Sequence, residues 1–213
     1  MYRGAVEDAK SARDAVQIAK GRPRGFDIDA ALDKALHVFW LHGYEGASLA
    51  DLTEAMGINR PSLYAAFGNK EELFRRALDR YAQRGPAAVV HRALNEATAQ
   101  AVVEHLLRGV AISLTDPENP RGCLAVQGAL TCGEASESIK QELCRRRAEG
   151  ERALRERLER AKTDGDLAAN VDAAALARFV STVTQGMSVQ AAGGASRDDL
   201  LRVADMALKA WPG

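Results

Sequence analysis

The sequence lacks long apolar segments. Its longest uninterrupted apolar runs, Leu63 to Phe67 and Ala173 to Ala177, are five residues long, whereas a membrane-spanning helix needs about 20 mostly apolar residues. The first 20 residues also lack the apolar centre of a signal peptide. We therefore expect a cytoplasmic protein that does not associate with membranes.

Cysteine is scarce and charge of one sign is not in excess. The three cysteines, Cys123, Cys132 and Cys144, are an odd set in a chain without an export signal, which argues against a disulfide framework. Lysine and arginine number 29, as do aspartate and glutamate, so the formal net charge is zero. A nucleic-acid partner must therefore be argued from local charge. The hydrophobic share of 46% excludes global disorder.

Motifs for catalysis and for metal binding are missing. There is no G-x-G-x-x-G, G-x-x-x-x-G-K-[ST], H-E-x-x-H or G-x-S-x-G, so we expect neither an enzyme nor a cofactor. Cys123 and Cys132 are nine residues apart, which puts them on opposite faces of one helix, and no metal site is predicted. A metal- or redox-responsive sensor, with Cys123 as a reactive thiol, stays an alternative.

What the sequence does contain is typical of helices. Aromatic residues make up only 5%, good helix formers dominate and no stretch alternates apolar and polar residues, which predicts an all-α fold. The predicted helices are 27–42, 48–56, 60–66, one from 69 up to Gly85-Pro86, one or two in 87–114, then 137–163, 172–191 and 197–211, with a further segment from Cys123 to Cys132.

Two short helices joined by a tight turn form the most informative motif. Ser48 and Asp51 predict a short capping box, and Gly57 stands where a turn needs a positive φ. Asn59 can cap the second helix, with Pro61 in its first turn. This is the build of a helix-turn-helix unit, whose second helix fits the major groove of DNA. Similar helix pairs also occur in all-α proteins that do not bind DNA.

Local charge favours DNA binding at this unit. Between residues 55 and 70 the cations are Arg60 and Lys70, and no acid is present. Arg60 could read guanine or hold a phosphate, and Lys70 is expected near the DNA backbone. Upstream, Arg22 and Arg24 flank a proline, which suits an arm that reaches into the adjacent minor groove.

A longer run of residues carries a family resemblance. It comprises Ala31, Phe39, Gly43-Tyr44, Ser48-Leu49, Leu52, Gly57-Ile58-Asn59-Arg60, Ser62-Leu63-Tyr64 and Phe67-Gly68-Asn69-Lys70-Glu71-Glu72-Leu73. With this run, residues 25–75 resemble the DNA-binding domain of the TetR family of bacterial transcription regulators. The resemblance implies a recognition helix carrying Ser62, Leu63 and Tyr64, with Tyr64 and Lys70 on phosphates. The candidate DNA-binding residues are then Arg22, Arg24, Ser48, Asn59, Arg60, Ser62, Leu63, Tyr64 and Lys70.

The chain departs from the family pattern at two places. Thr53 replaces a small alanine, and Ala65 and Ala66 replace larger residues, so base contacts there are expected to be few or apolar. Residues 1–20 are polar and have no clear apolar stripe, which predicts a flexible tail, either a frayed helix or plain disorder. The resemblance otherwise implies a helix-turn-helix domain at 21–70 and a helical effector-binding and dimerisation domain at 71–213. It implies a homodimeric repressor that a small-molecule effector releases from a palindromic DNA operator. A helical ligand-binding protein that does not bind DNA is the rival hypothesis.

Two further residue sets are predicted in the C-terminal part. An effector cavity between the helices of 87–191 would be lined by Leu106, Val110, Cys123, Val126, Gln127, Phe179 and Met187. The last two helices each carry one apolar stripe, which suits a four-helix dimer interface. Its residues would be Leu176, Val180, Val183, Met187, Leu200, Ala204, Ala207 and Trp211. The alternative is that both helices pack on their own subunit.

A run of three arginines lies in the predicted helix 137–163. We interpret Arg145-Arg146-Arg147 as a solvated face whose helical-spaced partners are Glu142, Glu149 and Glu151.

Overall fold

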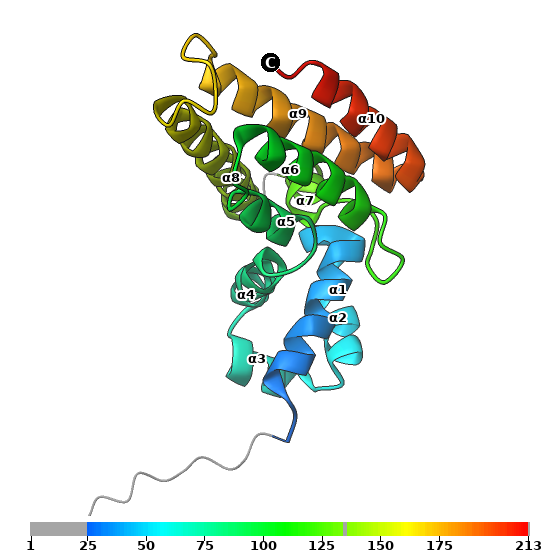
Figure 1. The fold of residues 1–213 in the computed structure, drawn as a ribbon. Helices are drawn as coiled ribbons and strands as arrows, with labels where there is room; N and C mark the ends of the chain where they lie inside the picture. Colours follow the sequence, from blue (N-terminus) through cyan, green and yellow to red (C-terminus); the bar gives the residue numbers. More distant parts are fainter. Residues whose placement is uncertain (1–24, 134–135, 213) are drawn as a thin grey trace, which may run out of the picture.

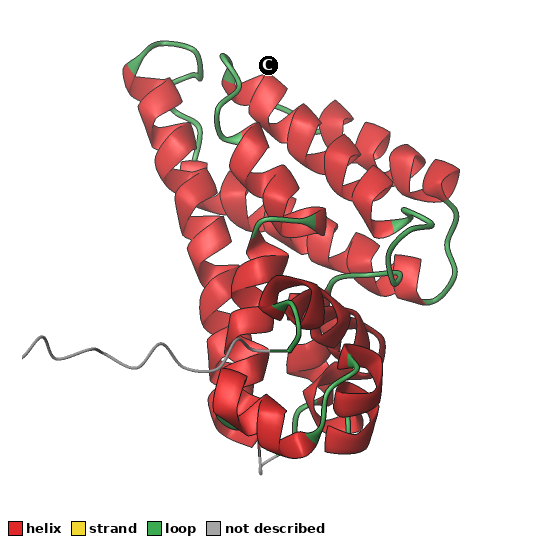
Figure 2. Ribbon diagram, turned by 90° about the horizontal axis from the view of Figure 1, so that it is seen from below, coloured by secondary structure: helices red, strands yellow, loops and turns green. Residues whose placement is uncertain are grey.

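The chain folds into helices alone over the part that can be described. The computed structural model describes residues 25–133 and 136–212, which form ten helices and no strand (Figure 2). They are α1 (Ile28–Gly46), α2 (Leu49–Met56), α3 (Arg60–Phe67), α4 (Lys70–Ala82), α5 (Gly85–Ala93), α6 (Ala99–Leu114), α7 (Leu124–Thr131), α8 (Glu137–Thr163), α9 (Ala173–Ala192) and α10 (Arg197–Lys209). The all-α prediction is confirmed. None of these helices has the length and apolar character of a membrane span.

The helices gather around two hydrophobic cores. The first core joins α1–α4 to α7 and the beginning of α8, and the second joins α5, α6, α9 and α10 to the rest of α8. Figure 1 shows α1–α4 at one end of the molecule, with α9 and α10 at the other. The first core therefore does not end at residue 70, because α4 contributes Leu73, Phe74 and Leu78 to it.

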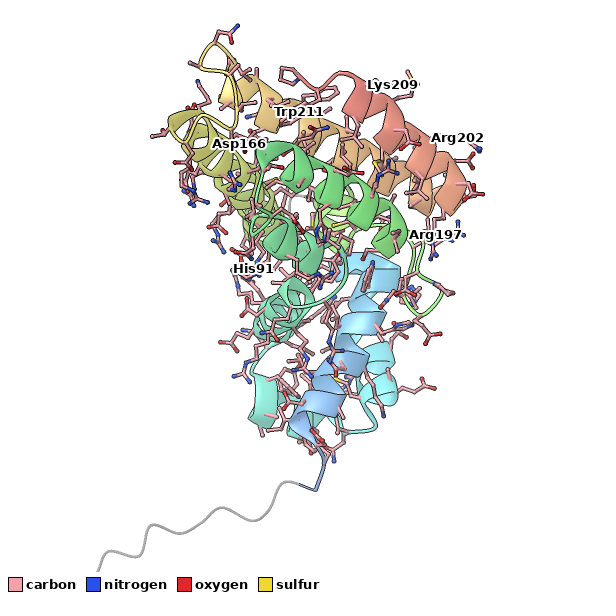
Figure 3. All side chains as sticks on the ribbon, in the orientation of Figure 1. His91, Asp166, Arg197, Arg202, Lys209 and Trp211 are labelled. Carbon is pink, nitrogen blue, oxygen red and sulfur yellow. The ribbon has the colours of Figure 1, made fainter. Side chains whose placement is uncertain are left out.

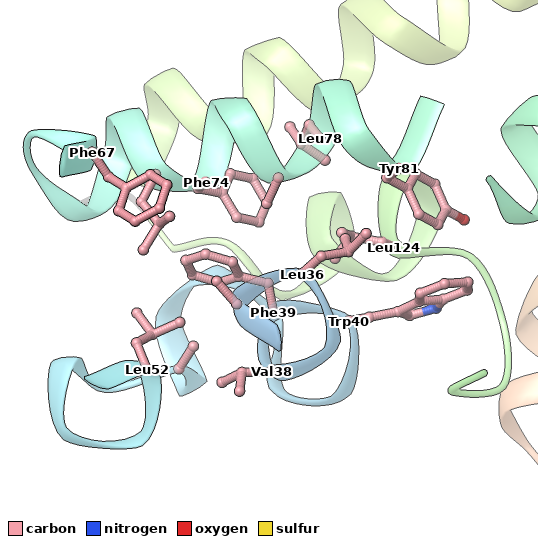
Figure 4. Close-up of a cluster of buried hydrophobic side chains, with 14 of the residues drawn as sticks. Leu36, Val38, Phe39, Trp40, Leu52, Phe67, Phe74, Leu78, Tyr81 and Leu124 are labelled. Carbon is pink, nitrogen blue, oxygen red and sulfur yellow. The ribbon is translucent and has the colours of Figure 1, made fainter. Parts of the chain in front are cut away.

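Aromatic side chains fill the first core (Figure 4). The rings of Phe39 and Phe74 meet edge to face with centroids 4.9 Å apart, and Trp40 and Tyr81 do so at 4.8 Å. Both pairs join α1 to α4, in a geometry that favours aromatic contacts beyond their buried area. Leu63 of α3 packs into the same core, fully buried. This core fixes the orientation of the short helix α3 on the larger α1–α4 scaffold.

Most predicted helix boundaries agree with the structure, and one needs correction. The first helix was expected to stop at Gly43, but α1 runs to Gly46 across a kink at that glycine, which has φ 70° and ψ 180°. The chain leaves helical geometry at Gly43, where a residue without a Cβ adopts positive φ at little cost, and then resumes one helical turn. The region 87–114 divides into α5 and α6.

The predicted dimer stripe on α9 and α10 is wrong for the residues at its centre. Val180, Met187, Leu200 and Ala204 are at most 1% exposed in the single subunit, so they have no surface to offer a partner. The others, Leu176, Val183, Ala207 and Trp211, pack partly buried against the same core. These stripes pack within the subunit's own second core, to which α6 also contributes. An amphipathic period predicts that a stripe is buried, but not which surface covers it.

Polar contacts hold both ends of α6 in this second core. The Asp166 carboxylate accepts a hydrogen bond from the backbone N–H of Ala99 at 2.6 Å, where α6 begins. At the other end, the guanidinium of Arg197 donates to the Thr115 hydroxyl at 3.2 Å. Figure 3 labels Asp166 and Arg197 at these two places. These bonds tie the two ends of α6 to the segment between α8 and α9 and to the start of α10.

Candidate nucleic-acid interface

The first helix of the predicted motif is capped as the sequence indicates. The hydroxyl of Ser48 accepts a hydrogen bond from the Asp51 N–H at 3.1 Å, and the Asp51 carboxylate accepts from the Ser48 N–H at 2.9 Å. Hydrogen bonds from the Ser48 side chain and from its backbone N–H lower the pKa of the exposed Asp51 carboxyl. Gly57 ends α2 with φ 70° and ψ 32°, in the left-handed region that favours glycine. The capping box and the turn are confirmed.

The second helix also begins and ends at the predicted residues. The Asn59 side chain accepts a hydrogen bond from the Ser62 N–H at 2.9 Å, and Pro61 occupies the first turn of α3. Gly68 ends the helix at φ 75°. A Cβ at Gly68 would collide with the carboxylate of Glu72, which caps the next helix by accepting from the Asn69 N–H at 2.9 Å. The α2–turn–α3–α4 unit is therefore fixed by local hydrogen bonds.

One face of α3 is open to solvent. Arg60 and Ala65 are exposed, Tyr64 is 48% exposed and Ser62 is half-buried. Arg60 and Tyr64 are four residues apart and so share a helix face. Leu63 is fully buried, so its assignment as a DNA-contacting residue is wrong. Its role is to anchor α3 in the first core, together with Ala66 and Phe67 on the buried side of the helix.

A hollow of about 330 Å³ adjoins this exposed face. Its lining residues are Gly25, Phe26, Gly57, Ile58, Asn59, Ser62, Ala65 and Ala66. Where the family pattern has larger side chains, Ala65 and Ala66 leave this space between α3 and the segment that leads into α1. Ile58, Ala65 and Ala66 were singled out in the sequence, whereas no local motif distinguishes Phe26 from an ordinary core residue. The predicted arm residues Arg22 and Arg24, and the predicted tail at 1–20, lie outside the described residues.

Lys70 is held close to the same surface. Its ammonium nitrogen lies 4.6 Å from the centroid of the Tyr44 ring, and the residue is half-buried. Burial lowers the pKa of Lys70, against the opposing effect of the nearby Glu45 and Asp51 carboxylates. The side chain is therefore oriented at the start of α4 rather than extended freely into solvent.

Three hydrogen bonds connect the first core with the C-terminal helices. The Trp40 indole donates to the Gly122 carbonyl oxygen at 3.1 Å, and the Tyr81 hydroxyl donates to the Cys123 sulfur at 3.2 Å. The Cys123 backbone N–H in turn donates to the Ser188 hydroxyl of α9 at 2.8 Å. Cys123 is half-buried against both cores. It thus stands at the junction through which α9 and α4 are linked.

Ion pairs form a second connection, between α4 and α8. Glu142 binds Arg145 and Arg146 on its own helix, each at 2.7 Å, and lies 3.8 Å from Arg75 of α4. Arg146 also reaches Asp79 of α4 at 2.6 Å. Hydrogen bonds from Arg145 and Arg146 lower the pKa of the nearly buried Glu142 carboxyl to about 2. These side chains hold α8 against α4.

The predicted effector residues fall into two groups. Leu106, Val110, Val126 and Met187 are buried, and Cys123 and Gln127 are half-buried, all among the helices of the C-terminal part. Phe179 is 41% exposed on α9, so it does not line an interior cavity, and its placement there was wrong. Within residues 25–133 and 136–212, no three His, Cys, Asp or Glu side chains gather as metal ligands would.

Sequence comparisons match both parts of the chain to one family. Residues 31–77 match the model for bacterial regulatory proteins of the tetR family, and residues 99–205 match the model for a tetracyclin repressor-like C-terminal domain. The HTH-type transcriptional repressor ComR of Escherichia coli (strain K12) is 39% identical over 207 residues, which cover 96% of this chain and 98% of ComR. The HTH-type transcriptional repressor BdcR of the same organism is 30% identical, over 88% of this chain and 90% of BdcR.

Solved structures agree with this assignment. A cysteine mutant of the TetR family regulator CifR, in complex with 26-bp double-strand operator DNA, is 49% identical to this chain and has a TM-score of 0.86. The match covers 90% of this chain and all of the CifR chain. With the helix-turn-helix geometry above, these matches establish that the chain belongs to the TetR family of bacterial transcription regulators.

Proposed function

We propose that this chain is a homodimeric repressor that inserts α3 of each subunit into the major groove of a palindromic operator. The observation that carries the proposal is the exposure of Arg60 and Tyr64 on one face of α3, while Leu63 anchors the other face in the core. A helix held in this way can enter the groove without rearranging its own support. The DNA complex of CifR, a relative with 49% identity, supports the same use of this unit here.

Each polar residue around α3 has a specific role in this proposal. Arg60 contacts a guanine edge or a phosphate, and Tyr64 donates its hydroxyl to a phosphate. Ser48 and Asn59 stand at the N-termini of α2 and α3, where backbone N–H groups also attract phosphate. Ser62 faces the hollow beside Ala65, which is open to an apolar contact with a thymine methyl group. Lys70 holds a phosphate from its position over Tyr44.

The dimer interface in this proposal is the outward face of α9 and α10. Four large apolar side chains are exposed there: Phe179, Val189, Val203 and Met206. Val203 and Met206 are three residues apart and so lie close together on α10, beside the buried stripe. Pairing this face with its symmetry copy would bury these side chains and build a four-helix interface. The two α3 helices would then meet half-sites about one helical turn or a little more apart.

The effector is proposed to act through the junction at Cys123. A small apolar or amphipathic molecule that enters the second core near Val110, Val126 and Met187 would displace α9 or α7. Cys123 is the N-cap of α7 and is hydrogen-bonded to Ser188 of α9, and its sulfur accepts a hydrogen bond from Tyr81 of α4. A change there would move α4, and with it the spacing of the recognition helices in the dimer. For release to follow, the effector must bind the conformation that does not fit the operator more tightly than the conformation that does.

A mobility-shift assay tests the proposal directly. The full-length protein should shift a fragment from upstream of its own gene and not an unrelated fragment of equal length and base composition. Because phosphate contacts release counterions, the affinity should fall steeply between about 50 and 200 mM salt. Equal binding of both fragments, or binding of neither, would contradict the proposal. The second outcome is what a helical ligand-binding protein without a DNA partner predicts.

A further inference from the structure

A hollow in which half of the lining residues are arginines lies between α8 and α9, which contact each other. It has a volume of about 380 Å³ and is lined by Cys144, Arg147, Ala148, Glu151, Arg152, Arg155, Arg178 and Gln185. Four guanidinium groups thus surround one carboxylate, in a chain whose formal net charge is zero. The residues belong neither to the recognition helix nor to the buried core.

The one carboxylate that lines this hollow pairs with only one of its four guanidinium groups. Glu151 pairs with Arg178 of α9 at 2.8 Å, so it is not the partner of Arg147 that the helical spacing suggested. Arg147 donates to the Cys144 sulfur at 3.2 Å and has no carboxylate within ion-pair distance among the described residues. Over the same part of the chain, Arg152 and Arg155 have no ion pair and no side-chain hydrogen bond. Among the described residues, three of the four guanidinium groups of the hollow thus form no ion pair.

The adjacent arginines show how different this arrangement is. Arg145 binds both Glu142 and Glu149, and Arg146 binds Glu142 and Asp79. Those two arginines form a neutralised network on the side of α8 that faces α4. On the side that faces α9, Arg152 and Arg155 are three residues apart, and like charges at that spacing repel one another and destabilise a helix. A bound anion would relieve that repulsion.

We propose that this hollow binds a small-molecule polyanion, one that carries at least two phosphate or carboxylate charges. The planar guanidinium group matches phosphate and carboxylate oxygens in bidentate geometry. The hollow is within the size range of small-ligand sites. The Gln185 side chain has no hydrogen-bond partner among the described residues and adds an amide donor from α9. Arg147, Arg152 and Arg155 on α8 and Arg178 and Gln185 on α9 would hold the anion between the two helices.

Calorimetric titration of the full-length protein tests this site, with pyrophosphate as the phosphate probe and citrate as the carboxylate probe. We expect saturable binding of at least one probe at low ionic strength. The double substitution Arg152→Gln/Arg155→Gln should weaken it by at least about tenfold, because it removes two charge-assisted contacts. The matched control is Arg160→Gln on the exposed surface of the same helix, outside the hollow, which should change affinity by less than about twofold.

Operator binding and light scattering on the same variants separate this site from the proposed function. The double variant should keep the wild-type mass and operator affinity, because its residues are remote from α3. The proposal is overturned if neither probe binds at millimolar concentration, or if Arg160→Gln weakens binding as much as the double variant does. It is also overturned if the double variant changes the oligomeric state, since the hollow would then be covered by the second subunit.

Discussion

The indole N–H of Trp40 donates a buried hydrogen bond to the carbonyl oxygen of Gly122, 82 residues further along the chain. Trp40 belongs to α1, which supports the recognition helix, and Gly122 immediately precedes the N-cap of α7. Breaking such a bond leaves a buried polar group unsatisfied, at a cost of about 1–3 kcal/mol. Rotation of the first core against the C-terminal helices therefore requires this hydrogen bond to break, at that cost.

Arg60→Ala should weaken operator binding without changing the fold. Arg60 is exposed on α3, and loss of a base or phosphate contact of this kind costs about 1–3 kcal/mol. Fluorescence anisotropy with labelled operator measures the change. The control Arg92→Ala removes the same charge from the exposed surface of α5. If both variants bound like the wild type, or both lost affinity equally, Arg60 would have no specific contact with DNA.

Leu63→Ala should act on stability rather than on base recognition. Leu63 is fully buried in the first core, and truncation of a buried leucine costs about 2–5 kcal/mol. Urea unfolding followed by circular dichroism gives the change in the free energy of unfolding. Leu41→Ala, at a position 55% exposed on α1, should stay within about 0.5 kcal/mol of the wild type. A stable Leu63→Ala protein would be incompatible with the packing described for α3.

Gly68→Ala should destabilise the recognition unit. The residue has φ 75°, and a Cβ would also collide with the Glu72 carboxylate of the α4 capping box. Strain of this kind costs about 1–3 kcal/mol. Gly150→Ala is the matched control, because Gly150 lies within α8 with open space around its Cα, and alanine there should stabilise by about 0.5–1 kcal/mol. Thermal unfolding of both variants should move in opposite directions, and a shared direction would refute the argument.

Met206→Glu should convert the protein to monomers. Met206 is 64% exposed on α10, and a carboxylate in a closed apolar interface would lose its hydration without a partner. Light scattering measures the mass, with Arg160→Glu on the exposed surface of α8 as a control for added negative charge. An unchanged mass for Met206→Glu would move the interface away from this face. A charge at Ala204 would be uninformative, because that residue is buried within the subunit.

The Glu142 network should make stability depend on pH in a defined range. Because the folded-state pKa of Glu142 is about 2, below the ordinary 4.5, the ionised carboxylate stabilises the fold above about pH 4.5. That contribution is lost as the pH falls from there through 2. Glu142→Gln should therefore be about 2 kcal/mol less stable than the wild type at pH 7, and the difference should shrink towards pH 3.

Urea unfolding at pH 7, 5 and 3 measures this difference. Glu156→Gln, on the same helix at an exposed position, should follow the wild type at every pH. A difference between Glu142→Gln and the wild type that stayed constant from pH 7 to pH 3 would show that the ion pairs with Arg145 and Arg146 are not its source.

The local features of the DNA-binding unit could be predicted because each depends on residues close in sequence. Ser48 and Asp51 are three residues apart, and Asn59 and Ser62 likewise, so a capping motif identifies them. The site assignments that failed, among them Leu63 and Phe179, did so for a different reason. Leu63 and Phe179 both lie on helices that carry buried as well as exposed residues, and only the packing of the helix decides that Leu63 faces the core and Phe179 faces solvent. The predicted contacts of Arg60, Tyr64 and Lys70 with DNA stay predictions.

By itself, the sequence determined the all-α fold class, the capped helix-turn-helix and the family, because helix caps, glycine breaks and motif spacing operate within a few residues. Only the tertiary structure decided that the main apolar stripes of α9 and α10 are buried in their own subunit and that Glu151 pairs with Arg178 rather than Arg147. It also joined Trp40 to Gly122. Helical periodicity places residues on a common face, but the surface that this face meets is set by segments distant in the chain, whose packing no local pattern encodes.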